Sequence, residues 1–145
     1  IVAAGRGADG LAYVLADRSA ARLSPAGWAR RAVALHHELG ADRIVAEVNQ
    51  GGDMVAALIR QADEAAPVEQ VRATRGKWLR AEPVAALYEA GRVRHVGAFP
   101  ELEDEMCDFA AGGLSSGRSP DRLDALVWAL TALTGRSGEA RVRAL

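Results

Sequence analysis

A single carboxylate interrupts a short apolar run that is otherwise typical of a buried strand. The run extends from Ile44 to Val48 with Glu47 as its one charged member, and a glycine pair and a helical pattern from Asp53 follow it. An apolar run of this length, bounded by turn residues, indicates a central strand. Because a carboxylate in such a strand is costly unless it is paired, Glu47 is expected to have a metal ion or a basic partner.

The length and composition indicate an ordinary globular domain. The chain has 145 residues, of which 50% are apolar and 26% charged, enough for a proper hydrophobic core. A formal net charge of -1 gives no overall basic field, which argues weakly against a nucleic-acid-binding module. A nuclease site, however, needs acidic residues, and their negative charge can offset the positive charge of basic flanking segments in the net charge of the chain. The single cysteine, Cys107, excludes an internal disulfide and a cysteine-rich zinc site.

The ends of the chain and its hydropathy indicate where the protein is located and how its sequence is divided into domains. No stretch is apolar for long enough to span a membrane and no signal peptide is recognisable, so we expect no membrane partner and a cytoplasmic location. The chain starts at Ile1, inside a strand-like segment, and is therefore expected to be a fragment of a larger protein. We expect one domain over residues 1–135 and a flexible basic tail at 136–145.

The pattern along the chain predicts a hairpin followed by strands that alternate with helices. Two strand-like segments flank the glycine-rich turn at 5–10, which is typical of an antiparallel hairpin. Ser24 and Pro25 predict the start of the first helix, and Gly40 predicts its end. This order indicates an α/β domain with a mixed sheet. We predict strands at 1–4, 11–17, 44–48, 68–73 and 93–96, and helices at 25–39, 53–65, 78–90, 99–109 and 123–133.

Two prolines affect the predicted helices. Pro83 falls inside the helix predicted at 78–90, so this helix is expected to kink or restart there. The sequence Ser119-Pro120-Asp121 predicts a cap for the last helix, because a serine or aspartate side chain can accept from the free backbone N–H groups of the first turn.

A second acidic centre lies at the start of the last helix. Asp121 and Asp124 are three positions apart and therefore share a helical face. Asp121 has a simple explanation as a cap that complements the helix dipole. Asp124 lies in a run apolar enough that both of its faces look buried. If this helix packs against the Glu47 strand, the carboxylates converge into a site suited to Mg²⁺ or Mn²⁺, as in two-metal nucleases.

Several segments resemble the nuclease domain of phage terminase large subunits. Residues 46–55 resemble the second acidic motif of that family, and residues 119–130 resemble its C-terminal acidic motif. The resemblance covers nearly the whole chain from Ile1 to about Thr134. The segments between the two motifs that fit the same pattern, in the same order, are 76–84, 87–89, 91–93 and 99–106.

The resemblance implies an RNase H-like three-layer fold and a metal-dependent endonuclease that cuts concatemeric double-stranded DNA during head packaging. Carried over by motif, Glu47 would be the acid on the central strand, and Asp124, assisted by Asp121, the acid pair on the last helix. These three carboxylates would bind two Mg²⁺ or Mn²⁺ ions. Lys77 and Arg75, in the basic loop before a helix, would contact DNA. The implied protein partners are the terminase ATPase domain, the small terminase subunit and the portal protein.

The chain departs from the family in two ways. The family's first catalytic aspartate lies on a strand that precedes the segment at 1–4, and this strand is absent from the sequence. The phosphate-binding motif of the packaging ATPase is also absent. We therefore expect a sheet that lacks its first strand, weak metal binding, and weak or absent cleavage.

Other interpretations stay open at this stage. Glu47 could be a strand-end carboxylate paired with an arginine, and Asp124 could form a buried salt bridge with an arginine. The domain could be another RNase H-like nuclease, of the resolvase or transposase type. It could also be a catalytically inactive remnant that binds DNA or docks on the portal. Asp17, His95 and the acidic face at 101–108 are interpreted as surface features, and the three tryptophans as core residues.

Overall fold

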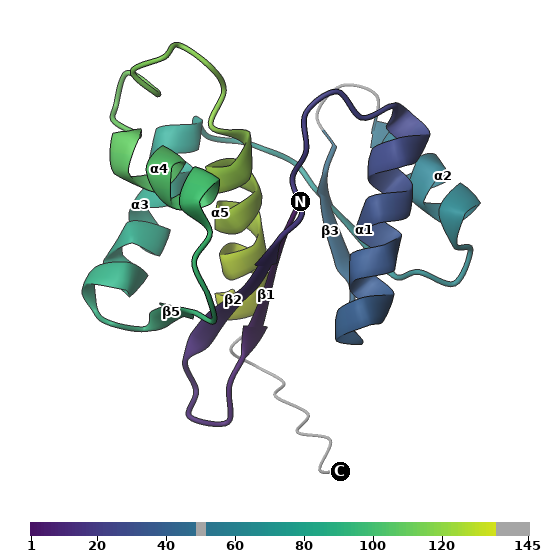
Figure 1. Ribbon diagram of the computed structural model, residues 1–145, viewed down its shortest axis with the longest axis horizontal. Helices are drawn as coiled ribbons and strands as arrows, with labels where there is room; N and C mark the ends of the chain where they lie inside the picture. The colour runs from purple at the N-terminus through teal and green to yellow at the C-terminus, as the bar shows by residue number, and fades with distance from the viewer. Residues whose placement is uncertain (49–51, 136–145) are drawn as a thin grey trace.

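The computed structural model describes residues 1–48 and 52–135, and its elements follow the predicted order (Figure 1). The predicted tail at 136–145 lies outside the described residues. The strands are β1 (Val2–Arg6), β2 (Ala12–Asp17), β3 (Ile44–Glu47), β4 (Val68–Val71) and β5 (Val93–His95). The helices are α1 (Pro25–Leu39), α2 (Gly52–Ala62), α3 (Lys77–Glu89), α4 (Pro100–Asp108) and α5 (Asp121–Thr134).

The first sheet is mixed, as the order of elements predicts. β1 and β2 form the expected antiparallel hairpin, and β5 pairs with β2 in parallel. Alternate residues of β2 are buried, which is the period that a strand with one covered face requires. Among them, Ala12 and Val14 pack in one hydrophobic cluster with Leu126 and Leu130 of α5.

The second sheet is small and separate. β3 and β4 pair in parallel, and α1 and α2 pack against them through a second cluster that includes Ala29, Ala46 and Ile59. The chain is thus an α/β domain with a mixed sheet and flanking helices, as expected for an RNase H-like fold. The central sheet, however, is divided into two.

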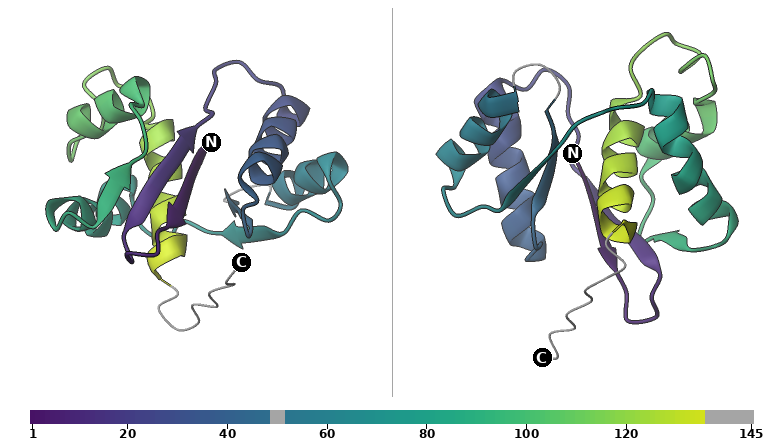
Figure 2. Two further views of the ribbon diagram at one scale, coloured as in Figure 1. Left: turned by 60° about the horizontal axis from the view of Figure 1, so that its bottom comes forward. Right: turned by 180° about the vertical axis from the view of Figure 1, so that it is seen from behind.

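A groove separates the two sheets. Among the described strands, β1 pairs only with β2 and β3 pairs only with β4, and both strands line this groove. Its other walls come from α1, through residues such as Ala32 and Leu35, and from α5, through Ala125 and Ala129. Both views in Figure 2 show α5 against the hairpin and α1 with α2 on the other side. A sheet that lacks one inner strand would be divided in this way.

The last helix, α5, joins the two halves. It contacts β1, β2, β3, α3 and α4. Leu126 and Leu130 are completely buried, and Leu123 and Val127 nearly so. Burying side chains of this size contributes about 1.5 to 3 kcal/mol each. None of the described helices combines the length and the apolar character needed to cross a membrane.

The first helix follows the sequence prediction closely. The Ser24 hydroxyl accepts a hydrogen bond from the Gly27 N–H, 3.1 Å away, which confirms the predicted cap. At the other end, Gly40 has a φ of 56°, in the left-handed region, and its N–H reaches the carbonyls of His36 and His37. A glycine adopts this conformation at little cost, so it ends the helix.

The third helix differs from the prediction at both its start and its middle. It begins at Lys77, so this residue lies in the first helical turn instead of in a loop. It also continues through Pro83 without restarting. Pro83 has no N–H to donate to the Leu79 carbonyl, four residues earlier in the helix. Because Pro83 and Leu79 are both exposed, this carbonyl is on the side of the helix that faces water.

The cap of α5 comes from another helix. Its N-cap residue is Pro120, and no side chain of the segment 119–121 makes a capping hydrogen bond, which corrects the sequence prediction. Instead, the Glu105 carboxylate of α4 accepts from the backbone N–H groups of Arg122 and Leu123, at 2.9 and 3.0 Å. A carboxylate at this position also complements the positive end of the helix dipole.

A buried ion pair ties the hairpin to the same helix end. The Arg122 Nη1 lies 2.6 Å from the Asp17 Oδ2, and only 4% of the Asp17 side chain is exposed, so its assignment to the surface was wrong. Burial by itself raises the pKa of the Asp17 carboxyl, but hydrogen bonds from Ser19 and Arg122 outweigh burial and hold this pKa below its usual value.

His95 is also not a surface residue. Its ring bonds to the Tyr88 hydroxyl at 2.7 Å through Nε2 and to the Glu103 carboxylate at 2.9 Å through Nδ1. A carboxylate only accepts, so Nδ1 is the protonated nitrogen. The hydrogen bond from His95 lowers the pKa of Glu103, and burial raises that of Tyr88. The acidic face at 101–108 is therefore only partly a solvent face.

We predict that Glu105→Ala lowers the free energy of unfolding by about 1 to 2 kcal/mol, since two backbone N–H groups of α5 lose their acceptor. Urea denaturation followed by circular dichroism measures this loss. Glu101→Ala is the matched control because Glu101 lies on the same helix, is exposed, and makes no described side-chain contact. Equal losses in both variants would contradict the capping role of Glu105.

We predict that Asp17→Asn makes the free energy of unfolding depend less strongly on pH in the acid range. The folded-state pKa of Asp17 is lowered, so its contribution is complete above the unfolded-state pKa and is lost as the pH falls through the folded-state pKa. The stability gap between the parent and the variant should therefore be widest near pH 7 and shrink below about pH 4. Asp104→Asn, at an exposed position of α4, should leave the profile unchanged. A gap independent of pH would refute the linkage.

Candidate functional site

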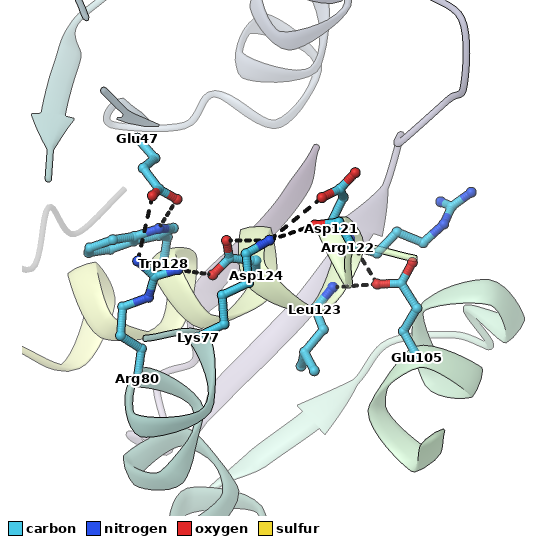
Figure 3. A network of polar contacts seen from close by, with 10 residues as sticks. Glu47, Lys77, Arg80, Glu105, Asp121, Arg122, Leu123, Asp124 and Trp128 are labelled. Carbon is cyan, nitrogen blue, oxygen red and sulfur yellow. Dashed lines mark hydrogen bonds and ion pairs between the residues drawn. The ribbon is translucent and has the colours of Figure 1, made fainter. Parts of the chain in front are cut away.

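Side chains from β3, α3 and α5 meet beside the groove in one network of polar contacts (Figure 3). Each element contributes from an end. β3 stops at Glu47, α3 starts at Lys77, and α5 starts at Asp121. The packing of α5 against β3 and α3 therefore determines how these charged side chains face one another.

Glu47 has the basic partner that its position in a strand requires. Its Oε1 lies 3.5 Å from Nη1 of Arg80, and its Oε2 accepts a hydrogen bond of 2.8 Å from the indole N–H of Trp128. The side chain is 24% exposed, so water still reaches it. Trp128, expected in the core, is only half-buried and places its polar edge on this carboxylate.

Asp124 is the more enclosed carboxylate, with 11% of its side chain exposed. Its Oδ1 accepts from Nη2 of Arg80 at 2.6 Å, and its Oδ2 lies 3.3 Å from the Lys77 ammonium. Each of its oxygens therefore faces a cation. The arrangement is the buried salt bridge with an arginine that the sequence left open as an alternative.

Arg80 links the two carboxylates, and sequence reasoning did not single it out. Its guanidinium carbon lies 4.9 Å from the centroid of the Trp128 ring, within range of a cation–π interaction. Its side chain is 11% exposed, and its buried Nε has no acceptor within the described parts of the chain. The signal in the sequence was its spacing of three from Lys77, which puts both cations on one face of α3.

Lys77 lies at the outer side of the network. Its ammonium donates to the Ser119 hydroxyl at 2.7 Å and lies 3.7 Å from Oδ1 of Asp121. Asp121 is 82% exposed and points toward this ammonium instead of capping its own helix. Arg75 is exposed, and the described contacts do not connect it to the carboxylates.

The donor atoms suit a divalent cation, although the present arrangement does not form a complete site. Glu47, Asp121 and Asp124 all line the groove, and carboxylate oxygens are the ligands that Mg²⁺ and Mn²⁺ prefer. Within residues 1–48 and 52–135, however, no three acidic, histidine or cysteine side chains are close enough together to hold a metal ion. The guanidinium of Arg80 lies between Glu47 and Asp124. The two cations of α3 balance the charge that a metal ion would balance.

The chain matches a known protein family. Residues 1–133 match the family model described as Terminase RNaseH-like domain. Among the described elements, the matched range takes in β1 to β5, α1 to α4, and α5 except its final residue. No curated protein and no solved structure matches the chain.

We predict that Arg80→Met destabilises the fold by about 3 kcal/mol, because it removes a buried partner from two carboxylates at once. Thermal and urea denaturation measure this loss. Arg72→Met, at an exposed position after β4, should change stability by no more than about 0.5 kcal/mol. Adding Asp124→Asn to Arg80→Met should restore part of the loss. A double variant that shows the simple sum of the two single losses would mean that the pair does not interact.

Proposed function

Because the chain belongs to the terminase RNase H-like domain family, we propose that it is the nuclease domain of a phage or prophage DNA-packaging terminase. In this role it hydrolyses phosphodiester bonds of concatemeric double-stranded DNA with the help of Mg²⁺ or Mn²⁺. The observation that carries the proposal is that Glu47 and Asp124, from distant parts of the sequence, share one guanidinium beside an open groove.

In the proposed site, Glu47 and Asp124 would hold the metal ions and Asp121 would assist from the exposed side. Bound divalent ions would supply an activated water molecule and would stabilise the leaving oxygen of the phosphodiester. Trp128 and Arg80 orient the two inner carboxylates, since each makes a direct contact with one or both of them. Positioning of this kind keeps ligand oxygens in a fixed geometry before the metal arrives.

DNA is proposed to approach along the start of α3, where Lys77 and Arg75 can contact its phosphates. The further partners are those of a packaging machine, namely the terminase ATPase domain, the small terminase subunit and the portal protein, in the cytoplasm of a bacterial host. Since the overall net charge is only -1, contact with the DNA backbone depends on local cations such as these two.

The groove between β1 and β3 supports the expectation of one further strand that carries another carboxylate. Glu47, Asp121 and Asp124 line this groove, so a strand inserted there would lie directly beside them. It would pair with the free edges of both sheets and join them into one. The 145 residues alone are then expected to bind metal weakly and to cut weakly or not at all.

The test is cleavage of linear duplex DNA in the presence of Mn²⁺, by the chain alone and by the chain extended with the first strand of the family. We predict that Asp124→Asn lowers cleavage by about 100-fold or more. Asparagine can still accept from Arg80, so the fold should be retained, and circular dichroism checks this. Asp104→Asn, at an exposed position of α4, is the control and should cut normally.

Three results would change the proposal. A variant Asp124→Asn that cuts as well as its parent would remove Asp124 from the site. Duplex binding without cleavage, even with the added strand, would favour an inactive DNA-binding or portal-docking module. A preference for four-way junctions over linear duplex would favour a nuclease of the resolvase type.

A further inference from the structure

Lys77 is the single lysine of this chain. The other 17 of its 18 lysine and arginine residues are arginines. Its ammonium lies 3.3 Å from Asp124 and 3.7 Å from Asp121 (Figure 3). An ammonium is a compact, strongly hydrated point charge, whereas a guanidinium is a flat fork of donors. At this position the lysine therefore provides a small cation between two carboxylates, which is also the arrangement that binds a metal ion.

The two cations of α3 are held very differently. Arg80 is 11% exposed, stacks on Trp128, and makes a hydrogen bond of 2.6 Å to Asp124. Lys77 is 37% exposed, and its distances to the carboxylates are those of a looser ion pair. Of its two ion pairs, the one with Asp121 is open to solvent and contributes little, because Asp121 is 82% exposed, whereas Asp124 is only 11% exposed. Arg80 is thus the more firmly held of the two cations. Lys77, which is more exposed to water although its ammonium also donates to the Ser119 hydroxyl at 2.7 Å, is the one that is more easily displaced.

We propose that Lys77 is a tethered counter-ion that a divalent metal displaces from Asp121 and Asp124, and that its freed ammonium then contacts a DNA phosphate. The inference rests on the proposed nuclease function and specifies how that site is regulated. Without metal, Lys77 neutralises the outer carboxylates. With metal bound, the like charge of the ion repels the ammonium, which has a flexible four-carbon stem to turn toward the DNA.

Such sharing couples metal binding to DNA binding. A metal ion that frees Lys77 raises the affinity for DNA, and by thermodynamic reciprocity DNA raises the affinity for the metal by the same factor. Couplings of this type are typically about 5- to 150-fold. The metal ion would then bind mainly when DNA is present, so that a nuclease site without DNA holds little metal.

The first experiment follows the chemical reactivity of Lys77 in the whole chain. Because it is the single lysine, acetylation of its side chain by a water-soluble acylating reagent can be followed by mass spectrometry of one peptide. We expect Mn²⁺ to speed acetylation of Lys77 by about fivefold or more, as the ammonium leaves the carboxylates. Adding a nuclease-resistant phosphorothioate duplex with the Mn²⁺ should slow it again. Unchanged or slower acetylation with Mn²⁺ would overturn the inference.

The second experiment measures Mn²⁺ affinity by isothermal titration calorimetry. Lys77→Met should bind Mn²⁺ on the order of tenfold more tightly than the parent chain, because the competing cation is gone. Arg72→Met is the control, since it removes a positive charge at an exposed position after β4 that has no described contact with the carboxylates, and it should change the affinity much less. Equal effects of the two substitutions would mean that only general electrostatics is at work.

These measurements separate the inference from the function on which it rests. If the parent chain and Lys77→Met bind Mn²⁺ equally well, the counter-ion role fails while the metal site stands. If neither binds Mn²⁺ at millimolar concentration, even when each is extended with the first strand of the family, the metal-dependent function fails and the inference falls with it.

Discussion

The guanidinium of Arg80 is the interaction on which the arrangement of this site depends. It contacts Glu47 from β3 and Asp124 from α5, and it stacks on Trp128, so one side chain of α3 connects three elements. Two carboxylates brought together beside a low-dielectric core would repel one another strongly without it. The carboxylates can therefore stay near one another in the folded chain before any metal ion is present.

This balance of charge also explains why the site lies where elements end. At an element end, a side chain has one side against the core and another toward water. Glu47, at 24% exposure, and Lys77, at 37%, keep access to solvent, whereas Arg80 is largely covered. The network thus has a more enclosed cation, Arg80, and a more exposed one, Lys77, about one turn apart on α3.

The sequence predicted what depends on local pattern. The hairpin, the start and end of α1 and the mixed character of the sheet follow from turn residues, caps and hydrophobic period. What it could not predict are partners set by tertiary packing. The capping of α5 by Glu105 and the burial of Asp17 against Arg122 both depend on how α4 and the hairpin meet α5. For Glu47, the sequence required a cation or a basic partner, and only the packing of α3 identified Arg80.

The groove between the sheets has a consequence for the behaviour of the chain in solution. Among the described strands, β1 and β3 each have one edge without a neighbour, and free edges are templates for pairing with strands of other molecules. Proteins limit such association by covering the edge or by placing charges or bulges on it, and a net charge of -1 adds little protection here. Whatever fills the groove would therefore also cover the edges of β1 and β3 and protect them from pairing with strands of other molecules.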